Sequence, residues 1–428
     1  MSPGKGRNRR GRWAFLLGLA AVIAYRAAPG RRSLALAWDI WRAGRGRPAD
    51  VTARQQARLV ALVAHARAHS RYYARRYRAV APGAGLRDLP PITKAELMAA
   101  FDDWVTDPGI TRARAADFVH DPSRIGDLFL GRYVVFTTSG TSGTPAILIQ
   151  DPGAMSVYNT IGYVRGLIFG QIGLRDGWRI LRGGARSVVV FAGGGHFVSA
   201  TLFERQCRDR PWRRRFRRSL SVQAPLPEIV RDLNAFRPVL LASYASMLDL
   251  LAAEQEARRL RIRPVIIGSA GETLPTTARS RIERAFGCGV RDVYATAETL
   301  AITRAGRRGA LPVNADWFIV EPVDQAYQPV PSGQLSHTVL VTNLANQVQP
   351  IIRYDLGDRV ILDPRPCPAA AHCRSCAWRD VRTTFCRSSA PPARPLPVVP
   401  LRRWRWRPSS KETPGVRRFR SFRPAPPN

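Results

Sequence analysis

Hydroxyl side chains and glycines alternate in one short run of this sequence, Thr137–Pro145. The run is flanked by two apolar segments typical of β-strands, Tyr133–Phe136 and Ala146–Ile149. Glycines let a backbone approach a ligand closely, and the many O–H and N–H donors suit a polyphosphate. The Lys-Ser/Thr pair that opens a helix in the common nucleotide-binding P-loop is absent. The run therefore predicts a strand, a donor-rich flap and a second strand. The alternative is an ordinary Ser/Gly hairpin turn.

Carboxylates occur at two further places where a β-like run ends. Asp292–Thr299 closes a short apolar run with Thr296 and Glu298, and Arg353–Asp358 follows the alternating segment Thr338–Leu344. One carboxylate together with phosphate oxygens and water is a ligand set that Mg²⁺ accepts, and a carboxylate can also accept hydrogen bonds from two neighbouring hydroxyls. Local alternatives stay open, because Glu298 could cap a helix and the last aspartate could form an Asx turn.

The surrounding pattern predicts the elements that must position these residues. Strands and helices alternate between residues 130 and 300, which favours an α/β core, and residues 310–363 are β-rich. Thr93 opens a helix that begins at Lys94 and has a capping-box glutamate, so Lys94 is expected to be a solvated first-turn residue. Apolar residues at helical spacing predict a helix within residues 51–80. The other expected elements are helices at Leu226–Phe236 and Ser246–Leu260, and strands at Ser187–Phe191, Val239–Leu241 and Val265–Gly268.

Charge is distributed unevenly along the 428 residues, which carry 67 Lys and Arg against 31 Asp and Glu for a formal net charge of +36. Residues 1–87 hold +17 and residues 364–428 hold +13, so residues 88–363 hold only +6. Only three of the cationic residues are lysines, and the first explanation for this strong preference for arginine is a GC-rich gene. Because the motif-bearing middle is only mildly basic, the charge does not argue for a nucleic-acid partner.

An uncharged stretch, Trp13–Tyr25, follows a basic one near the start of the chain. Its thirteen residues are too few to span a bilayer comfortably, which takes about 20 apolar residues. Three interpretations are open: a core or surface helix, peripheral membrane contact through residues 1–30, and a signal-like segment or misplaced start.

Six cysteines in a chain of this length do not indicate a disulfide scaffold. Cys207 and Cys288 are isolated and are expected to be buried thiols. The other four gather near His372 and could hold a structural zinc, although their spacing fits no standard zinc finger; they are Cys367, Cys373, Cys376 and Cys386.

In their order along the chain, these segments resemble the adenylate-forming (acyl-AMP) superfamily, and most closely its phenylacetate–coenzyme A ligase branch. Supporting segments are Pro91–Leu97, Gly268–Pro275 and Asn314–Phe318. The resemblance covers residues 88–363 and implies an α/β fold, with a large adenylate-forming N-terminal domain of mixed sheets and helices and a β-rich subdomain. It also implies ATP-dependent activation of a carboxylic acid to an acyl adenylate, followed by thioester formation with coenzyme A.

The resemblance further implies a role for each matched residue. Glu298 would bind Mg²⁺, Thr296 would reach the α-phosphate, and Asp358 would accept hydrogen bonds from both ribose hydroxyls. Arg353 would contact phosphate or brace its turn. An adenine slot would be formed by Ala270, Gly271, Glu272 and Tyr294, and an acyl pocket by His196 and Phe197. The β- and γ-phosphates would be held by Thr138, Ser139, Gly140, Thr141, Ser142 and Gly143. The local alternatives are a structural His196 and a Tyr294 that belongs to the core.

The chain departs from the family pattern after Asp363. The family carries a small C-terminal lid domain there, with a Gly-Arg-x-Asp-Asp hinge and a lysine, and neither is recognisable in the Pro- and Arg-rich residues 364–428. One hypothesis is a lost reading frame, since codons for Arg382–Cys386 can encode Asp-Asp-Val-Leu in another frame. The alternative is a natural basic tail. The expected division is a basic N-terminal region (1–87), an adenylate-forming core (88–363) and an aberrant tail (364–428) that replaces the lid.

We therefore expect a cytoplasmic, ATP- and Mg²⁺-dependent ligase acting on an aromatic or fatty acid, with coenzyme A as the expected acceptor and no nucleic-acid partner. Without a lid, water would reach the adenylate. One alternative is a relative that passes the acyl or adenylyl group to another acceptor. Another is a non-catalytic nucleotide-binding remnant that contacts membranes through its N-terminus.

Overall fold

The computed structural model of this chain describes residues 31–44, 46–81, 83–138, 145–165, 174–303, 311–362 and 381–383. These residues all belong to one unit of the chain, Met1–Cys386. Four sets of sequence predictions lie outside the described residues: those on the N-terminal residues 1–30, on the four clustered cysteines, on the tail 364–428 apart from residues 381–383, and on the flap residues Ser139, Gly140, Thr141, Ser142 and Gly143.

A five-stranded parallel sheet is formed by the middle of the chain, and its strand order is β4-β3-β5-β6-β7. Because parallel neighbours need crossover connections, helices separate its strands along the sequence. The strands are β3 (Ser187–Phe191), β4 (Arg217–Ser221), β5 (Leu240–Ser243), β6 (Ile266–Ala270) and β7 (Val290–Val293). The crossover helices are α10 (Val198–Asp209), α11 (Leu226–Phe236), α12 (Ala245–Glu256) and α13 (Thr276–Phe286). Every one of these strands ends at the same edge of the sheet, which confirms the expected α/β core.

The remaining described strands form antiparallel pairs. β1 (Val134–Thr137) and β2 (Ile147–Gln150) make the predicted hairpin on either side of the flap. β8 (Phe318–Val323), β9 (Thr338–Asn343) and β10 (Ile351–Asp355) form a three-stranded sheet with β9 in its centre. β11 (Val360–Leu362) pairs with β12 (Val381–Thr383). These strands confirm that residues 310–363 are β-rich.

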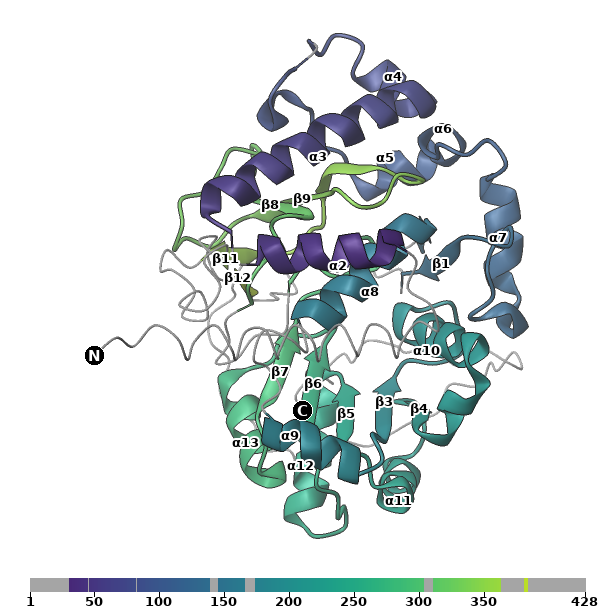
Figure 1. Cartoon of the computed structure of the whole chain (residues 1–428), viewed down its shortest axis with the longest axis vertical. Helices are drawn as coiled ribbons and strands as arrows, with labels where there is room; N and C mark the ends of the chain where they lie inside the picture. Colours follow the sequence, from purple (N-terminus) through teal and green to yellow (C-terminus); the bar gives the residue numbers. More distant parts are fainter. Residues whose placement is uncertain are drawn as a thin grey trace, which may run out of the picture. The chain divides into compact units, whose positions relative to one another are not determined.

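Helices precede and follow the hairpin. They are α2 (Arg31–Ala43), α3 (Pro48–His69), α4 (Arg71–Arg76), α5 (Lys94–Ala99), α6 (Phe101–Trp104), α7 (Arg112–His120), α8 (Pro152–Tyr163) and α9 (Leu174–Arg182). Short 3-10 helices lie at Leu86–Asp88, Pro122–Arg124 and Pro211–Arg215. α2 lies beside α8, as Figure 1 shows.

The single helix expected within residues 51–80 is wrong in one respect, because two helices, α3 and α4, occupy this segment. The chain is extended at Ser70, where the Oγ accepts a hydrogen bond from Tyr73 N at 3.3 Å and so caps α4. The capping box at Thr93 is confirmed by the contacts of Thr93 and Glu96 with each other's backbone N–H groups.

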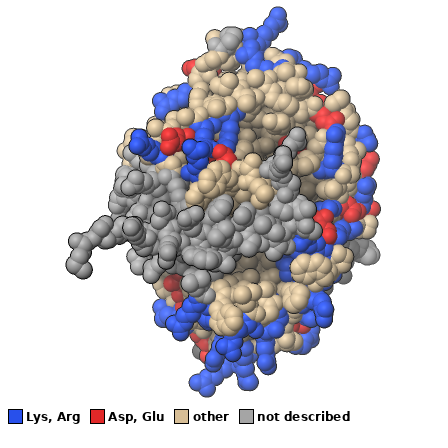
Figure 2. All heavy atoms as spheres, in the orientation of Figure 1, with Lys and Arg blue, Asp and Glu red and all other residues tan. Residues whose placement is uncertain are grey.

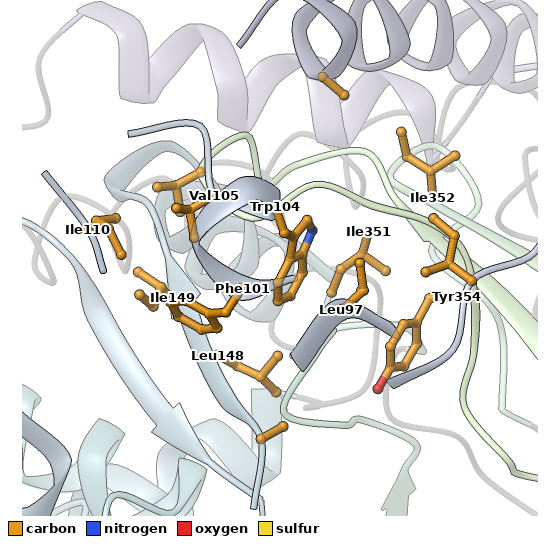
Figure 3. Packing of buried hydrophobic residues seen from close by; sticks show 14 of the residues in the cluster. Leu97, Phe101, Trp104, Val105, Ile110, Leu148, Ile149, Ile351, Ile352 and Tyr354 are labelled. Carbon is orange, nitrogen blue, oxygen red and sulfur yellow. The ribbon is translucent and has the colours of Figure 1, made fainter. Parts of the chain in front are cut away.

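One apolar core joins the first helices to the hairpin and to β10. In Figure 3 the Trp104 ring lies between Phe101 and Ile351, and all three side chains are at most 2 % exposed. The Trp104 Nε1 and the Tyr73 hydroxyl both donate to the Pro350 carbonyl, at 2.7 and 2.8 Å. The residue just before β10 is therefore fixed by two donors from the N-terminal helices.

Basic side chains are spread around the described surface on the face drawn in Figure 2, with acidic side chains among them. Many of the arginines pair with carboxylates, for example Arg281 with Glu256 at 2.8 Å and Arg259 with Glu254 at 2.7 Å. Within the described ranges, no helix combines the length and apolar character that a membrane crossing requires.

Candidate functional site

The carboxyl-end edge of the parallel sheet gathers the loops that the sequence singles out. The glycine loop with His196 follows β3, Gly271 follows β6, and the segment with Thr296 and Glu298 follows β7. In open α/β sheets this edge is where ligands bind, because the loops after the strands meet there. His196 and Glu298, far apart in sequence, are thereby both placed in loops at this edge of the sheet.

Asp358 and Tyr294 meet at this edge. The Tyr294 hydroxyl donates to Asp358 Oδ2 at 2.7 Å. Burial raises the pKa of the Asp358 carboxyl, and the hydrogen bond from Tyr294 opposes that rise because it favours the ionised form. The ring of Tyr294 is 4 % exposed and packs in a core cluster with Tyr158 and Phe318. The Tyr294 hydroxyl is thus directed to Asp358, and the place of its ring in an adenine slot stays a prediction.

Glu298 is a buried carboxylate, 7 % exposed, that lies five residues after β7 ends. Its Oε1 accepts a hydrogen bond of 3.2 Å from the hydroxyl of Tyr354 on β10. Its backbone carbonyl accepts a second one, of 3.1 Å, from the amide of Asn343 on β9. These contacts anchor Glu298 to the three-stranded sheet, and they do not make it a helix cap.

A chain of buried polar side chains holds the same loop from the hairpin side. The Asn343 amide also donates to the Tyr158 hydroxyl at 2.7 Å, and that hydroxyl donates to Gln150 Oε1 at 3.0 Å. The Gln150 Nε2 in turn donates to the Ala297 carbonyl at 3.3 Å. Buried polar networks of this kind fix one arrangement, because each broken bond would strand a desolvated group.

Thr296 lies in a tight turn that it closes with Thr299. The two residues exchange backbone hydrogen bonds of 3.2 Å, and their hydroxyls lie 2.9 Å apart. The turn restrains the backbone between β7 and Glu298. The proposed contact of Thr296 with an α-phosphate stays a prediction.

The base of the flap is closed by Thr138. Its backbone N–H donates to the Ala146 carbonyl at 3.1 Å, and its Oγ1 accepts from the Ala146 N–H at 3.0 Å. The Nζ of Lys94 donates to the same Oγ1 at 3.1 Å. Lys94 is half-exposed in the first turn of α5, as expected, and its ammonium group also lies where the flap leaves β1. One residue earlier, Thr137 N donates to the His196 carbonyl at 2.8 Å and joins the hairpin to the loop after β3.

The segment predicted as an adenine slot follows β6. Gly271 has φ +79°, and a Cβ at this position would come within 2.9 Å of the Tyr244 ring, so glycine is required twice over. The Glu272 carboxylate accepts from the N–H and the Oγ of Ser246, at 2.9 and 3.0 Å. It therefore caps the first turn of α12. Ala270 ends β6, and the binding of adenine by these residues stays a prediction.

His196 is 1 % exposed, and its ring packs against Phe118 of α7 with ring centroids 5.3 Å apart. Its Nε2 lies 3.4 Å from the Asp121 carbonyl, and burial lowers its pKa, which favours the neutral ring. These are the contacts of a structural histidine, which favours the local alternative. Phe197 is half-buried at the start of α10. Both places in an acyl pocket stay predictions.

Arg353 is directed to the protein interior, with its Nε 3.2 Å from Glu321 Oε2. Its Nη1 donates to the carbonyls of Leu89 and Arg87, at 2.6 and 3.1 Å. Three acceptors thus surround a guanidinium whose side chain is 6 % exposed. Between the two roles that the sequence allowed, these contacts favour the brace.

A magnesium ion would find one carboxylate here, that of Glu298. The described residues contain no group of three or more His, Cys, Asp or Glu side chains that could hold a metal ion alone. The binding of Mg²⁺ by Glu298 stays a prediction.

Four residues with contacts at this edge were given no role in the site by the sequence: Lys94, Tyr244, Asn343 and Tyr354. Lys94 had one available signal, as the sole lysine in residues 6–410 of a chain otherwise supplied with arginine. The other three stand in apolar segments and show their role only when the strands are placed beside one another.

Comparison with known proteins links this fold to coenzyme A ligases. No family model matches the chain. Protein CapK of Staphylococcus aureus is 28 % identical over 136 residues, a match that spans 31 % of this chain and 29 % of CapK.

An open conformation of 2-hydroxyisobutyryl-CoA ligase, solved with 2-HIB-AMP and CoA, superimposes with a TM-score of 0.54 at 20 % identity over 77 % of this chain and 67 % of that one. The same ligase in its thioesterification state gives a TM-score of 0.53 over 77 % of this chain and 65 % of the other. The chain thus has the mixed α/β fold of such ligases, and this likeness shows the fold alone.

Proposed function

We propose that this chain activates a carboxylic acid with ATP to form an acyl adenylate, and that coenzyme A is the acceptor of the acyl group. The observation that carries the proposal is the meeting of three features at one edge of the sheet: the Asp358–Tyr294 pair, the anchored Glu298, and the flap base with Lys94 and Thr138. The fold shared with 2-hydroxyisobutyryl-CoA ligase supports it.

In the proposed reaction a carboxylate oxygen of the acid attacks the α-phosphorus of ATP. The bond from that phosphorus to the bridging oxygen breaks, and pyrophosphate leaves with the electron pair. In such a transfer the protein contributes mainly positioning and charge stabilisation. Asp358 would hold the ribose, and the flap with Lys94 would hold the β- and γ-phosphates. Glu298 would hold Mg²⁺, which offsets the phosphate charge.

The acyl substrate class is an aromatic or fatty acid by resemblance, and a cytoplasmic location would supply the ATP. Transfer of the acyl group to coenzyme A would be the second step, and it is supported by the shared fold rather than by particular side chains. A thiol would attack the adenylate carbonyl and AMP would leave, and without a recognisable lid domain water would compete with the thiol.

The test is pyrophosphate release by the purified chain with ATP and Mg²⁺ over a panel of aryl and fatty acids. Glu298→Gln removes the carboxylate charge and retains its size, and Glu256→Gln, which alters an exposed pair with Arg281, serves as a matched control. Release that one acid stimulates, and that only Glu298→Gln abolishes, is expected. Binding of ATP without release from any acid would favour the non-catalytic nucleotide-binding alternative.

A further inference from the structure

The turn after β10 carries two aspartates whose surroundings differ. Asp355 accepts hydrogen bonds through both carboxylate oxygens: from the Tyr327 hydroxyl at 2.9 Å, from Gly357 N at 2.9 Å, and from the Thr338 hydroxyl. Asp355 therefore makes the Asx turn that sequence reasoning left open for Asp358. Its acceptor capacity is used to build the turn.

Asp358 is half-buried and has a different set of contacts. Within the described part of the chain its carboxylate accepts one side-chain hydrogen bond, that from Tyr294 to Oδ2. The other oxygen, Oδ1, remains for a ligand. A hydrogen bond at one oxygen fixes the plane of a carboxylate and hence the direction of its second oxygen.

Tyr294 is itself held rigidly. Its ring is buried in the cluster that includes Tyr158, Phe318 and Val339, and its backbone N–H donates to Thr303 Oγ1 at 2.9 Å. Because the ring of Tyr294 is fixed, its hydroxyl oxygen has a fixed position next to Asp358. The contact is thus set by the core rather than by a flexible surface group.

We infer that Tyr294 is a positioning residue for sugar recognition: it clamps Asp358 Oδ2 so that the carboxylate is presented in one orientation to the ribose hydroxyls of the nucleotide. This inference rests on the proposed function, because it needs a ribonucleotide at Asp358. It gives Tyr294 a role that acts through Asp358, beside its expected place in the adenine slot, which stays a prediction.

Binding of three nucleotides distinguishes this role from a purely structural one. ATP, 2′-deoxy-ATP and 3′-deoxy-ATP are titrated by calorimetry into the full chain and into Tyr294→Phe, with Mg²⁺ and without carboxylic acid. Since a hydrogen bond to a charged group commonly changes an affinity about tenfold or more, we expect the full chain to prefer ATP over each deoxy analogue by about that factor. In Tyr294→Phe the preference should fall to about twofold, with the affinities for the deoxy analogues almost unchanged.

Asp358→Asn is the second variant, and the double variant completes the cycle. Because both residues act on the same contact, Tyr294→Phe should add almost nothing in the Asp358→Asn background. An equal loss of affinity for all three nucleotides, or an unchanged preference for ATP, would overturn the inference and leave the proposed function standing. Failure of the unaltered chain to bind ATP would overturn both. Thermal unfolding of Tyr294→Phe checks that the variant is folded.

Discussion

Arg353 offers a direct choice between a residue that braces the fold and one that contacts phosphate. Its Nε pairs with Glu321 at 3.2 Å, and the two side chains are 6 % and 15 % exposed. The Nη1 donates to two backbone carbonyls, those of Arg87 and Leu89. The informative change is Arg353→Met, which keeps the length of the side chain and removes its charge and its donors.

The expected cost follows from these contacts. Removing one partner of a buried ion pair costs about 3–5 kcal/mol, because the remaining charge is left without compensation. Adding Glu321→Gln removes that charge and should restore about 1–3 kcal/mol, whereas the carbonyls of Arg87 and Leu89 still lack their donor. Arg353 has φ +50°, but Met pays the same backbone cost, so strain does not enter the difference.

The deficit should also depend on pH. Burial raises the pKa of Glu321, and Arg353 opposes that rise, so Arg353→Met raises the pKa further. When the pKa of a carboxyl is higher in the folded than in the unfolded state, the group stabilises the folded state at low pH. This stabilisation is lost as the pH rises through the folded-state pKa. The variant should therefore regain stability relative to the unaltered chain between pH 7 and pH 5.

Urea unfolding at pH 7 and pH 5 measures the free energies of unfolding, and calorimetry measures ATP affinity. Arg231→Met is the matched control, since the exposed pair with Asp232 should contribute less than about 1 kcal/mol. Unaltered stability of Arg353→Met together with a large loss of ATP affinity would refute the brace and restore the phosphate contact.

Three further changes test other contacts. Lys94→Gln should weaken ATP binding about tenfold, as expected for the loss of a charged phosphate ligand. Lys94→Arg should retain most of the affinity. Equal ATP affinities of the two variants in calorimetry would contradict this prediction. Glu272→Ala should cost about 0.5–2 kcal/mol in urea unfolding, because α12 loses its cap at Ser246, and an unchanged unfolding midpoint would argue against the cap. Trp104→Phe should lower the free energy of unfolding by about 1–3 kcal/mol, because the Pro350 carbonyl loses one of its two donors. In the double variant with Tyr73→Phe, which removes the second donor, the loss should exceed the sum of the two single losses. Strictly additive losses would contradict this prediction.

Local sequence signals predicted much of the fold. The Thr93 capping box placed the start of α5, and the continuous apolar run at Ser187–Phe191 placed β3, because both depend on neighbours in the chain. The break at Ser70 escaped detection because helical spacing of apolar residues continues across it, and only the serine's capping contact marks the new helix.

The candidate site was predicted less completely, for a physical reason. Glu298, Asp358 and Thr138 were recognised from motifs, but their partners come from other elements: Tyr354 from β10, Tyr294 from the end of β7, and Lys94 from α5. Such contacts depend on how strands pair and pack, which the pattern of one segment does not encode. The same limit applies to Glu272, because its contact with Ser246 at the start of α12 also lies outside its own segment.

The products formed from ATP test the central claim most directly. The purified chain is incubated with ATP, Mg²⁺ and a stimulating carboxylic acid without coenzyme A, and the quenched mixture is analysed by mass spectrometry. The proposed function predicts an acyl adenylate, or AMP and free acid from its hydrolysis, together with pyrophosphate, all absent with Glu298→Gln. Formation of ADP and inorganic phosphate, or turnover that needs no carboxylic acid, would contradict it.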